Sequence, residues 1–138
     1  MFWKIKAQFD AVHNLKDYDG FCANLHGHKL EVEVIFGVKP EKIQKAKEVL
    51  KEKGYLVDFK DLDRVVNNVL PAHFYLNEVY KLKNATVERL GVILFKKISE
   101  ELSKLTDLVE LQMVYLKETA NSGVVVDEGA FKWLKDLV

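Results

Sequence analysis

The chain has 138 residues, and its 21 basic and 21 acidic side chains give a formal net charge of zero. This balance excludes a general nucleic-acid binder, which needs a basic excess. The length predicts a single domain over 1–138, and no apolar run is long enough to span a membrane. Because one cysteine cannot form an intramolecular disulfide and no secretory signal is visible, we expect a cytoplasmic protein.

The first part of the chain predicts two strands joined by a polar loop. Residues 2–12 are rich in aromatic and β-branched types, but their apolar positions break strict alternation, which predicts an irregular strand. Residues 14–25 are typical of a loop. Residues 28–36 alternate apolar and charged side chains, as in a strand with one polar face.

Two amphipathic helices are expected next, over 40–53 and 59–70, with a short strand at 55–57 between them. Gly54 is suited to end the first helix and Pro71 to end the second. The apolar stripes are Ile43, Ala46, Val49 and Leu50 in the first helix, and Phe59, Leu62, Val65, Val66 and Val69 in the second.

The C-terminal part predicts one long helix, two strands and a short terminal helix at 128–137. Thr86 is expected to cap the long helix at 87–103, after an irregular stretch over 72–85. In the strand at 107–117, Val109, Leu111, Met113 and Tyr115 are expected to share one face, and Gly123 interrupts the chain before the strand at 124–126. Together the elements predict an α+β fold in which helices cover an antiparallel sheet.

The histidines are the most informative side chains. His26 and His28 are two residues apart, so on a strand they lie on the same face. His13 completes a set of three if its strand lies beside the first. Three imidazoles with an open fourth position are typical of catalytic zinc. The alternative is a group of histidines hydrogen-bonded within a core.

Five other residues are candidates for chemistry, each with a simpler alternative. Cys22 precedes His26 by four residues, and a nearby metal would favour its thiolate, but cysteine is also a common small core residue. His73 is otherwise a solvated loop histidine. Glu118 ends a strand and could hold a guanidine-like edge through two hydrogen bonds, or could simply face solvent. Thr86 and Glu88 are explained most simply as a helix cap and a first-turn acid.

In this order the motifs resemble those of the 6-pyruvoyltetrahydropterin synthase and 6-carboxytetrahydropterin synthase family. The specific element is Cys22-x-x-x-His26-Gly27-His28, and its interval of three residues is that of the carboxytetrahydropterin branch. The resemblance runs over nearly the whole chain, through residues 9–13, 22–28, 57–59, 73, 76–77, 86–88 and 118–119.

The resemblance implies the tunnelling fold. Its antiparallel sheet carries two main helices on one face, to which this chain would add a helix near 40–53 and a short C-terminal helix. It also implies a homo-oligomer, a trimer or hexamer, with active sites between subunits. The implied partner is a small-molecule pterin triphosphate, and neither nucleic acid nor membrane is expected.

The resemblance also implies residue roles. His13, His26 and His28 would bind Zn²⁺, and Cys22 and His73 would be catalytic. Glu118 would anchor the pterin ring, with Thr86 and Glu88 near the pocket. The implied reaction converts 7,8-dihydroneopterin triphosphate to 6-carboxy-5,6,7,8-tetrahydropterin, releasing acetaldehyde and triphosphate, in the synthesis of deazaguanine tRNA bases such as queuosine.

Two departures leave alternatives open. Ala72 stands where the family usually has Asp before the catalytic histidine, and the helix at 40–53 replaces what is often a tight hairpin. The alternatives are a pyruvoyl product, side-chain cleavage to 6-hydroxymethyldihydropterin, or a pterin-binding homologue with weakened catalysis.

Overall fold

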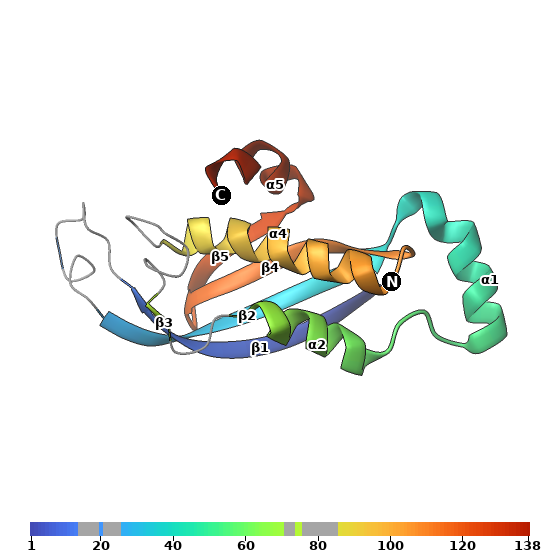
Figure 1. Ribbon diagram of the computed structural model, residues 1–138, viewed down its shortest axis with the longest axis horizontal. Helices are drawn as coiled ribbons and strands as arrows, with labels where there is room; N and C mark the ends of the chain where they lie inside the picture. The colour runs from blue at the N-terminus through green and yellow to red at the C-terminus, as the bar shows by residue number, and fades with distance from the viewer. Residues whose placement is uncertain (14–19, 21–25, 71–73, 76–85) are drawn as a thin grey trace.

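The computed structural model describes residues 1–13, 20, 26–70, 74–75 and 86–138, and in these residues one sheet has the strand order β3-β1-β2-β4-β5 (Figure 1). The strands are β1 (Phe2–His13), β2 (His26–Val38), β3 (Phe74–Tyr75), β4 (Val109–Thr119) and β5 (Ser122–Asp127). The helices are η2 (Pro40–Lys42), α1 (Ile43–Lys53), α2 (Phe59–Val69), α4 (Val87–Leu105), α5 (Glu128–Leu134) and η3 (Lys135–Leu137). The α+β prediction is confirmed.

Strand β1 is regular, so the predicted irregularity is wrong. It pairs with β2 in one unbroken antiparallel register, from Phe2 opposite Gly37 to His13 opposite His26. The apparent break came from Phe2, which is 68% exposed and lies outside the buried set. β3 adds a short parallel pairing to β1, in a sheet that is otherwise antiparallel.

Strand β4 contains a bulge that changes which side chains are buried. Phe36 of β2 lies opposite Leu111, but Ile35 lies opposite Met113, so Gln112 is an extra residue. The predicted common face is therefore wrong beyond Leu111, because the bulge exchanges odd for even positions. The buried residues are Val109 and Leu111 before the bulge, and Val114 and Leu116 after it.

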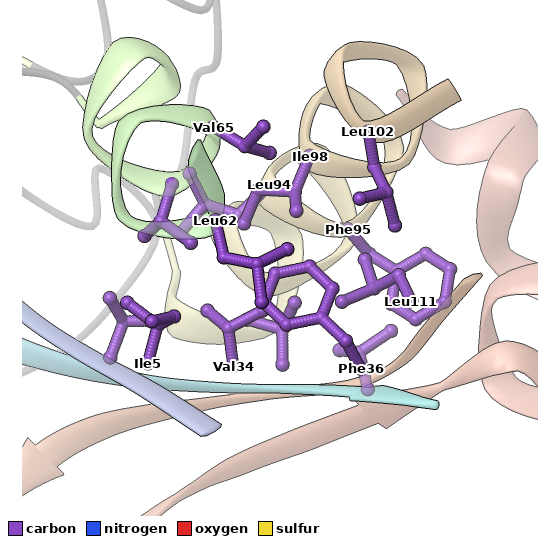
Figure 2. Close-up of a cluster of buried hydrophobic side chains, with 14 of the residues drawn as sticks. Ile5, Val34, Phe36, Leu62, Val65, Leu94, Phe95, Ile98, Leu102 and Leu111 are labelled. Carbon is purple, nitrogen blue, oxygen red and sulfur yellow. The ribbon is translucent and has the colours of Figure 1, made fainter. Parts of the chain in front are cut away.

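Helices α2 and α4 lie side by side on one face of the sheet and cover the core, as predicted (Figure 1). Thr86 caps α4 by accepting a hydrogen bond from the Arg89 backbone N–H at 3.3 Å. Figure 2 shows side chains of both helices meeting those of β1, β2 and β4. The most completely buried are Phe36, Leu30, Leu62, Leu90, Leu94, Ile98, Leu102, Leu116, Val32, Val34 and Val66.

Helix α1 projects from one end of the sheet, and the predicted strand at 55–57 does not form (Figure 1). Gly54 ends α1 with a φ of 84°, a left-handed conformation that glycine adopts without strain. The helix buries Ala46, but Ile43 is 53% exposed, so its apolar stripe is only partly covered. Phe59 in α2 is 61% exposed, against the prediction that it faces the core.

Helix α5, which is followed by the short helix η3, packs against α4. The Phe131 ring stacks on Phe95 with centroids 4.9 Å apart. Gly123 lies inside β5 rather than interrupting it, and the close approach of the Leu116 backbone oxygen leaves no room for a β-carbon at this position. In the described part of the chain, no helix is long and apolar enough to cross a membrane.

Candidate functional site

The strand register brings the three predicted histidine positions together at one end of the sheet. His13 of β1 lies directly opposite His26 of β2, and His28 lies opposite Ala11. Directly opposed residues share a face of an antiparallel sheet, with Cβ atoms about 4.5–5.5 Å apart. Positions 26 and 28 share a face because they are two residues apart. All three positions therefore belong to one face.

That face is the one covered by the helices. Position 28 is two residues from Leu30, and position 13 is four residues from Phe9, so each lies on the same face of its strand as that residue. Leu30 and Phe9 are both buried in the core. The histidine positions thus continue the apolar rows of β1 and β2 toward the end of the sheet. The sequence indicates the same face, because His28 is an even number of residues from Leu30, Val32 and Val34.

Glu118 lies near the end of β4, just beyond the last residue that pairs with β2. That last pair is Lys117 opposite Glu31, and the register of β4 with β5 shifts between Lys117 and Thr119. Glu118 is thus an extra residue at a second irregularity of β4, where simple alternation from the buried Leu116 does not apply. Its side chain is half-buried. The role of Glu118 in binding a ligand stays a prediction.

Helix α4 begins at this same end of the molecule, where β2 begins and β4 ends (Figure 1). Thr86 is its N-cap, and Glu88 is an exposed acid in its first turn. A negative charge there stabilises the helix dipole. The predictions that Thr86 caps the helix and that Glu88 is a first-turn acid are confirmed. A role of either residue in binding substrate stays a prediction.

Cys22, Ala72 and His73 lie outside the described residues, so their catalytic roles stay predictions. The structure does locate the strand that follows His73 in the sequence. β3 begins at Phe74, which pairs with Ala11, and Ala11 in turn pairs with His28. The described backbone on the C-terminal side of position 73 therefore runs beside the histidine end of β1.

The opposite face of the sheet carries a charged cluster that the sequence analysis did not single out. The Glu33 carboxylate forms an ion pair with the Lys6 amine at 3.2 Å, and the Lys117 amine lies 4.0 Å from Glu33 and 3.9 Å from Glu31. The hydrogen bond from Lys6 lowers the pKa of the Glu33 carboxyl, and the positive charge of Lys117 adds to the effect. The Lys117 amine also lies 5.4 Å from the centre of the Tyr115 ring.

This cluster is separate from the histidine positions because it lies on the other side of the sheet. Its signal in the sequence was the lysines at alternate positions of β1 and the glutamates at alternate positions of β2. Cross-strand pairing of opposite charges makes such rows favourable. The arrangement keeps Glu33 ionised.

Comparison with known proteins gives a consistent result. The family model described as 6-pyruvoyl tetrahydropterin synthase matches residues 3–129. The chain is 32% identical over 96 residues to a 6-carboxy-5,6,7,8-tetrahydropterin synthase of Synechocystis sp., covering 67% of this chain and 70% of that protein. It is 31% identical over 99 residues to a putative 6-carboxy-5,6,7,8-tetrahydropterin synthase of Archaeoglobus fulgidus, covering 70% and 75%.

Solved structures share the fold. The 6-pyruvoyl tetrahydropterin synthase of Caenorhabditis elegans superposes with a TM-score of 0.70 at 22% identity, covering 92% of this chain and 94% of that chain. The enzyme of the same name from Plasmodium falciparum gives a TM-score of 0.51 at 17% identity, covering 91% and 96%. The tunnelling fold expected from the sequence is therefore the fold observed. With the family model matching almost the full length, the chain belongs to the 6-pyruvoyl tetrahydropterin synthase family.

Proposed function

We propose that this chain converts 7,8-dihydroneopterin triphosphate to 6-carboxy-5,6,7,8-tetrahydropterin, with release of acetaldehyde and triphosphate, in a zinc-dependent reaction. The observation that carries the proposal is the cross-strand register, which puts positions 13, 26 and 28 on one face. The curated relatives with the carboxytetrahydropterin name support this product. The three-residue interval between Cys22 and His26 supports it as well.

The donor set fits zinc. Three neutral imidazoles from two paired strands provide the nitrogen ligands that zinc prefers, and they leave a fourth position for substrate. A zinc ion held there supplies Lewis-acid polarisation of the oxygens on the substrate side chain. Metal binding requires the neutral form of each histidine, so we expect zinc affinity to fall in acid.

The remaining roles belong to the chain's own side chains. In the proposal, Cys22 and His73 remove and return protons along the substrate side chain. The Glu118 carboxylate accepts two parallel hydrogen bonds from the guanidine-like edge of the pterin and so fixes the ring. Its half-buried position at the end of β4 favours this role, because a partly desolvated carboxylate gives stronger hydrogen bonds.

We further propose a cytoplasmic homo-oligomer, trimeric or hexameric, with active sites between subunits. The outer strand β5 supports this, because it pairs with β4 on one side only among the described residues. An edge strand of this kind is available for pairing with another copy. Deazaguanine tRNA bases are the proposed destination of the product.

The test has a product arm and a metal arm. Purified protein is incubated with dihydroneopterin triphosphate and the pterins are separated by mass, with 6-carboxytetrahydropterin expected. Zinc content is then measured in His26→Ala and His28→Ala, where it should be lost. Lys29→Ala is the matched control, because Lys29 is exposed at the adjacent, opposite-parity position. Full zinc occupancy in both histidine variants would contradict the metal assignment.

Ala72 favours a second candidate function. An Asp before His73 would orient the imidazole and stabilise its charged form, and its loss favours a different product or slow turnover. The alternatives are the pyruvoyl product, cleavage to 6-hydroxymethyldihydropterin, or pterin binding without efficient catalysis. In Ala72→Asp, a faster reaction or a shifted pH optimum would support the second candidate. An unchanged rate and pH profile would show that the missing carboxylate is not limiting.

A further inference from the structure

A groove of about 350 Å³ lies away from the histidine end, between α4, α5 and the start of β4. It is formed by the C-terminal half of α4, whereas Thr86 and the proposed pterin site are at the beginning of that helix. Its volume is within the range of small-molecule sites, about 300–1,000 Å³. Nothing in the proposed reaction uses it.

The floor of the groove is apolar and aromatic. Phe95, Leu102 and Leu111, which Figure 2 labels, are buried beside one another in the core, and Val109 extends this surface. Phe131 of α5 forms a half-buried wall, and its ring stacks on Phe95 at an interplanar angle of 27°. Such a floor favours a ligand with a flat aromatic or aliphatic body.

The rim is cationic. Lys39, Lys132 and Lys135 line it. One rim carboxylate, Glu128, pairs with Lys132 at 3.7 Å, and the other, Glu110, accepts a hydrogen bond from the Gln112 amide at 3.2 Å.

The amines of Lys39 and Lys135 are therefore available to contact a ligand. In the described part of the chain, neither Lys39 nor Lys135 takes part in an ion pair. Ser99 adds a hydroxyl donor between floor and rim. The rim as a whole has three amines and two carboxylates, a net charge of +1, because the neutral amide bonded to Glu110 leaves that carboxylate charged. The groove thus combines an apolar base with a net positive rim.

From this complementarity we propose that the groove binds a small amphipathic anion, in which an aromatic or aliphatic body carries one acidic group. The body lies on the Phe95 and Phe131 surface, and the acidic group lies between the amines of Lys39 and Lys135. The paired Glu128–Lys132 side chains form the neutral part of the rim. The site is independent of the pterin reaction, so it would exist whether or not the proposed function holds.

The probes are 1-anilinonaphthalene-8-sulfonate, an amphipathic aromatic sulfonate, and N-phenyl-1-naphthylamine, which lacks the acidic group. Fluorescence titration of the full chain should give saturable sulfonate binding. The double variant Lys39→Gln/Lys135→Gln should weaken it at least several-fold and leave the uncharged probe unchanged. Lys47→Gln, an exposed lysine of α1, is the matched control and should bind as the parent does.

Two further variants make the test decisive. Ser99→Trp fills the groove and should abolish binding of both probes, with the circular dichroism spectrum retained. Phe59→Ser removes an exposed ring from a different apolar patch and should have no effect. Equal sulfonate affinity in the double lysine variant, or loss of the signal in Phe59→Ser, overturns the proposal. So does a change of sedimentation coefficient in Ser99→Trp, which would show that another copy covers the groove.

Discussion

The two faces of the sheet are made by the same strands, yet they are held together by different forces. On the helix-covered face, β2 presents Leu30, Val32, Val34 and Phe36, each with 0% exposure, and the same row continues to the histidine positions. On the open face, Glu31 and Glu33 meet lysines of the neighbouring strands. The comparison shows that alternate positions of one strand have different roles. One set of residues contributes to the core and the proposed site, and the other set contributes to the charged surface.

The largest effect is expected at the proposed catalytic residues. Cys22→Ala should lower turnover by on the order of 10²–10⁴-fold, because a positioned proton-transfer group contributes that much. Zinc and pterin binding should persist, as shown by metal analysis and fluorescence titration. If Cys22 and His73 act as one unit, the double variant should be hardly slower than the slower single variant. Turnover close to that of the parent in Cys22→Ala would remove the thiol from the mechanism.

Stability should distinguish the two faces of a single strand. Leu116 of β4 is fully buried, so Leu116→Ala should cost about 2–5 kcal/mol of unfolding free energy. Met113→Ala, three residues earlier on the open face and only half-buried, should cost clearly less. Urea denaturation of the two variants measures the difference. Equal losses would show that the bulge does not separate the faces as described.

Pterin binding should distinguish Glu118 from its neighbour Lys117. Glu118→Ala should weaken pterin binding by about 1–3 kcal/mol, because the ring's donors lose their acceptor. Lys117→Ala is the matched control, since Lys117 pairs with Glu31 on the open face. Calorimetric titration with a pterin, together with zinc analysis, tests both. A loss of affinity in Lys117→Ala and none in Glu118→Ala would contradict the proposed role of Glu118 as the ring anchor.

The smallest effect is expected from the charged face. The hydrogen bond from Lys6 holds the pKa of the Glu33 carboxyl below its ordinary value, so the ionised carboxylate stabilises the fold at neutral pH. The contribution should be lost as pH falls through the lowered pKa, because protonation breaks the ion pair. Glu33→Gln should remove about 0–1 kcal/mol at neutral pH. Urea midpoints from pH 7 to pH 3 should fall less steeply in the variant than in the parent, and parallel curves would contradict the coupling.

Much of the fold was predictable because its local signals agree with its packing. Thr86 before a long apolar stripe gave α4 and its cap, and Gly54 gave the end of α1. Phe59 was misassigned because a helical stripe does not show where the covering partner ends. The strand expected at 55–57 fails because these residues find no neighbouring strand to pair with in the described sheet.

The site was predictable to the level of a shared strand face. The spacing of His26 and His28 showed that they share a face, but the pairing of His13 with His26 was expected only on the condition that the two strands lie side by side. The buried positions of β4 beyond Leu111 did not follow, because an extra residue in β4 leaves no mark in the alternation before it. The groove beside α5 was also invisible, since it depends on how α5 packs against α4 and β4.

The bulge at Gln112 also sets how β4 responds to a change of length. Without Gln112, Leu111 and Met113 would be neighbours opposite Phe36 and Ile35, and the strand would alternate regularly. Val114 and Leu116 would then keep their buried face. Loss of one residue after the bulge, with the bulge retained, would instead turn Leu116 to the open face, because a shift of one position reverses every later side chain. The bulge is thus the point at which this strand tolerates loss of a residue without moving its buried side chains.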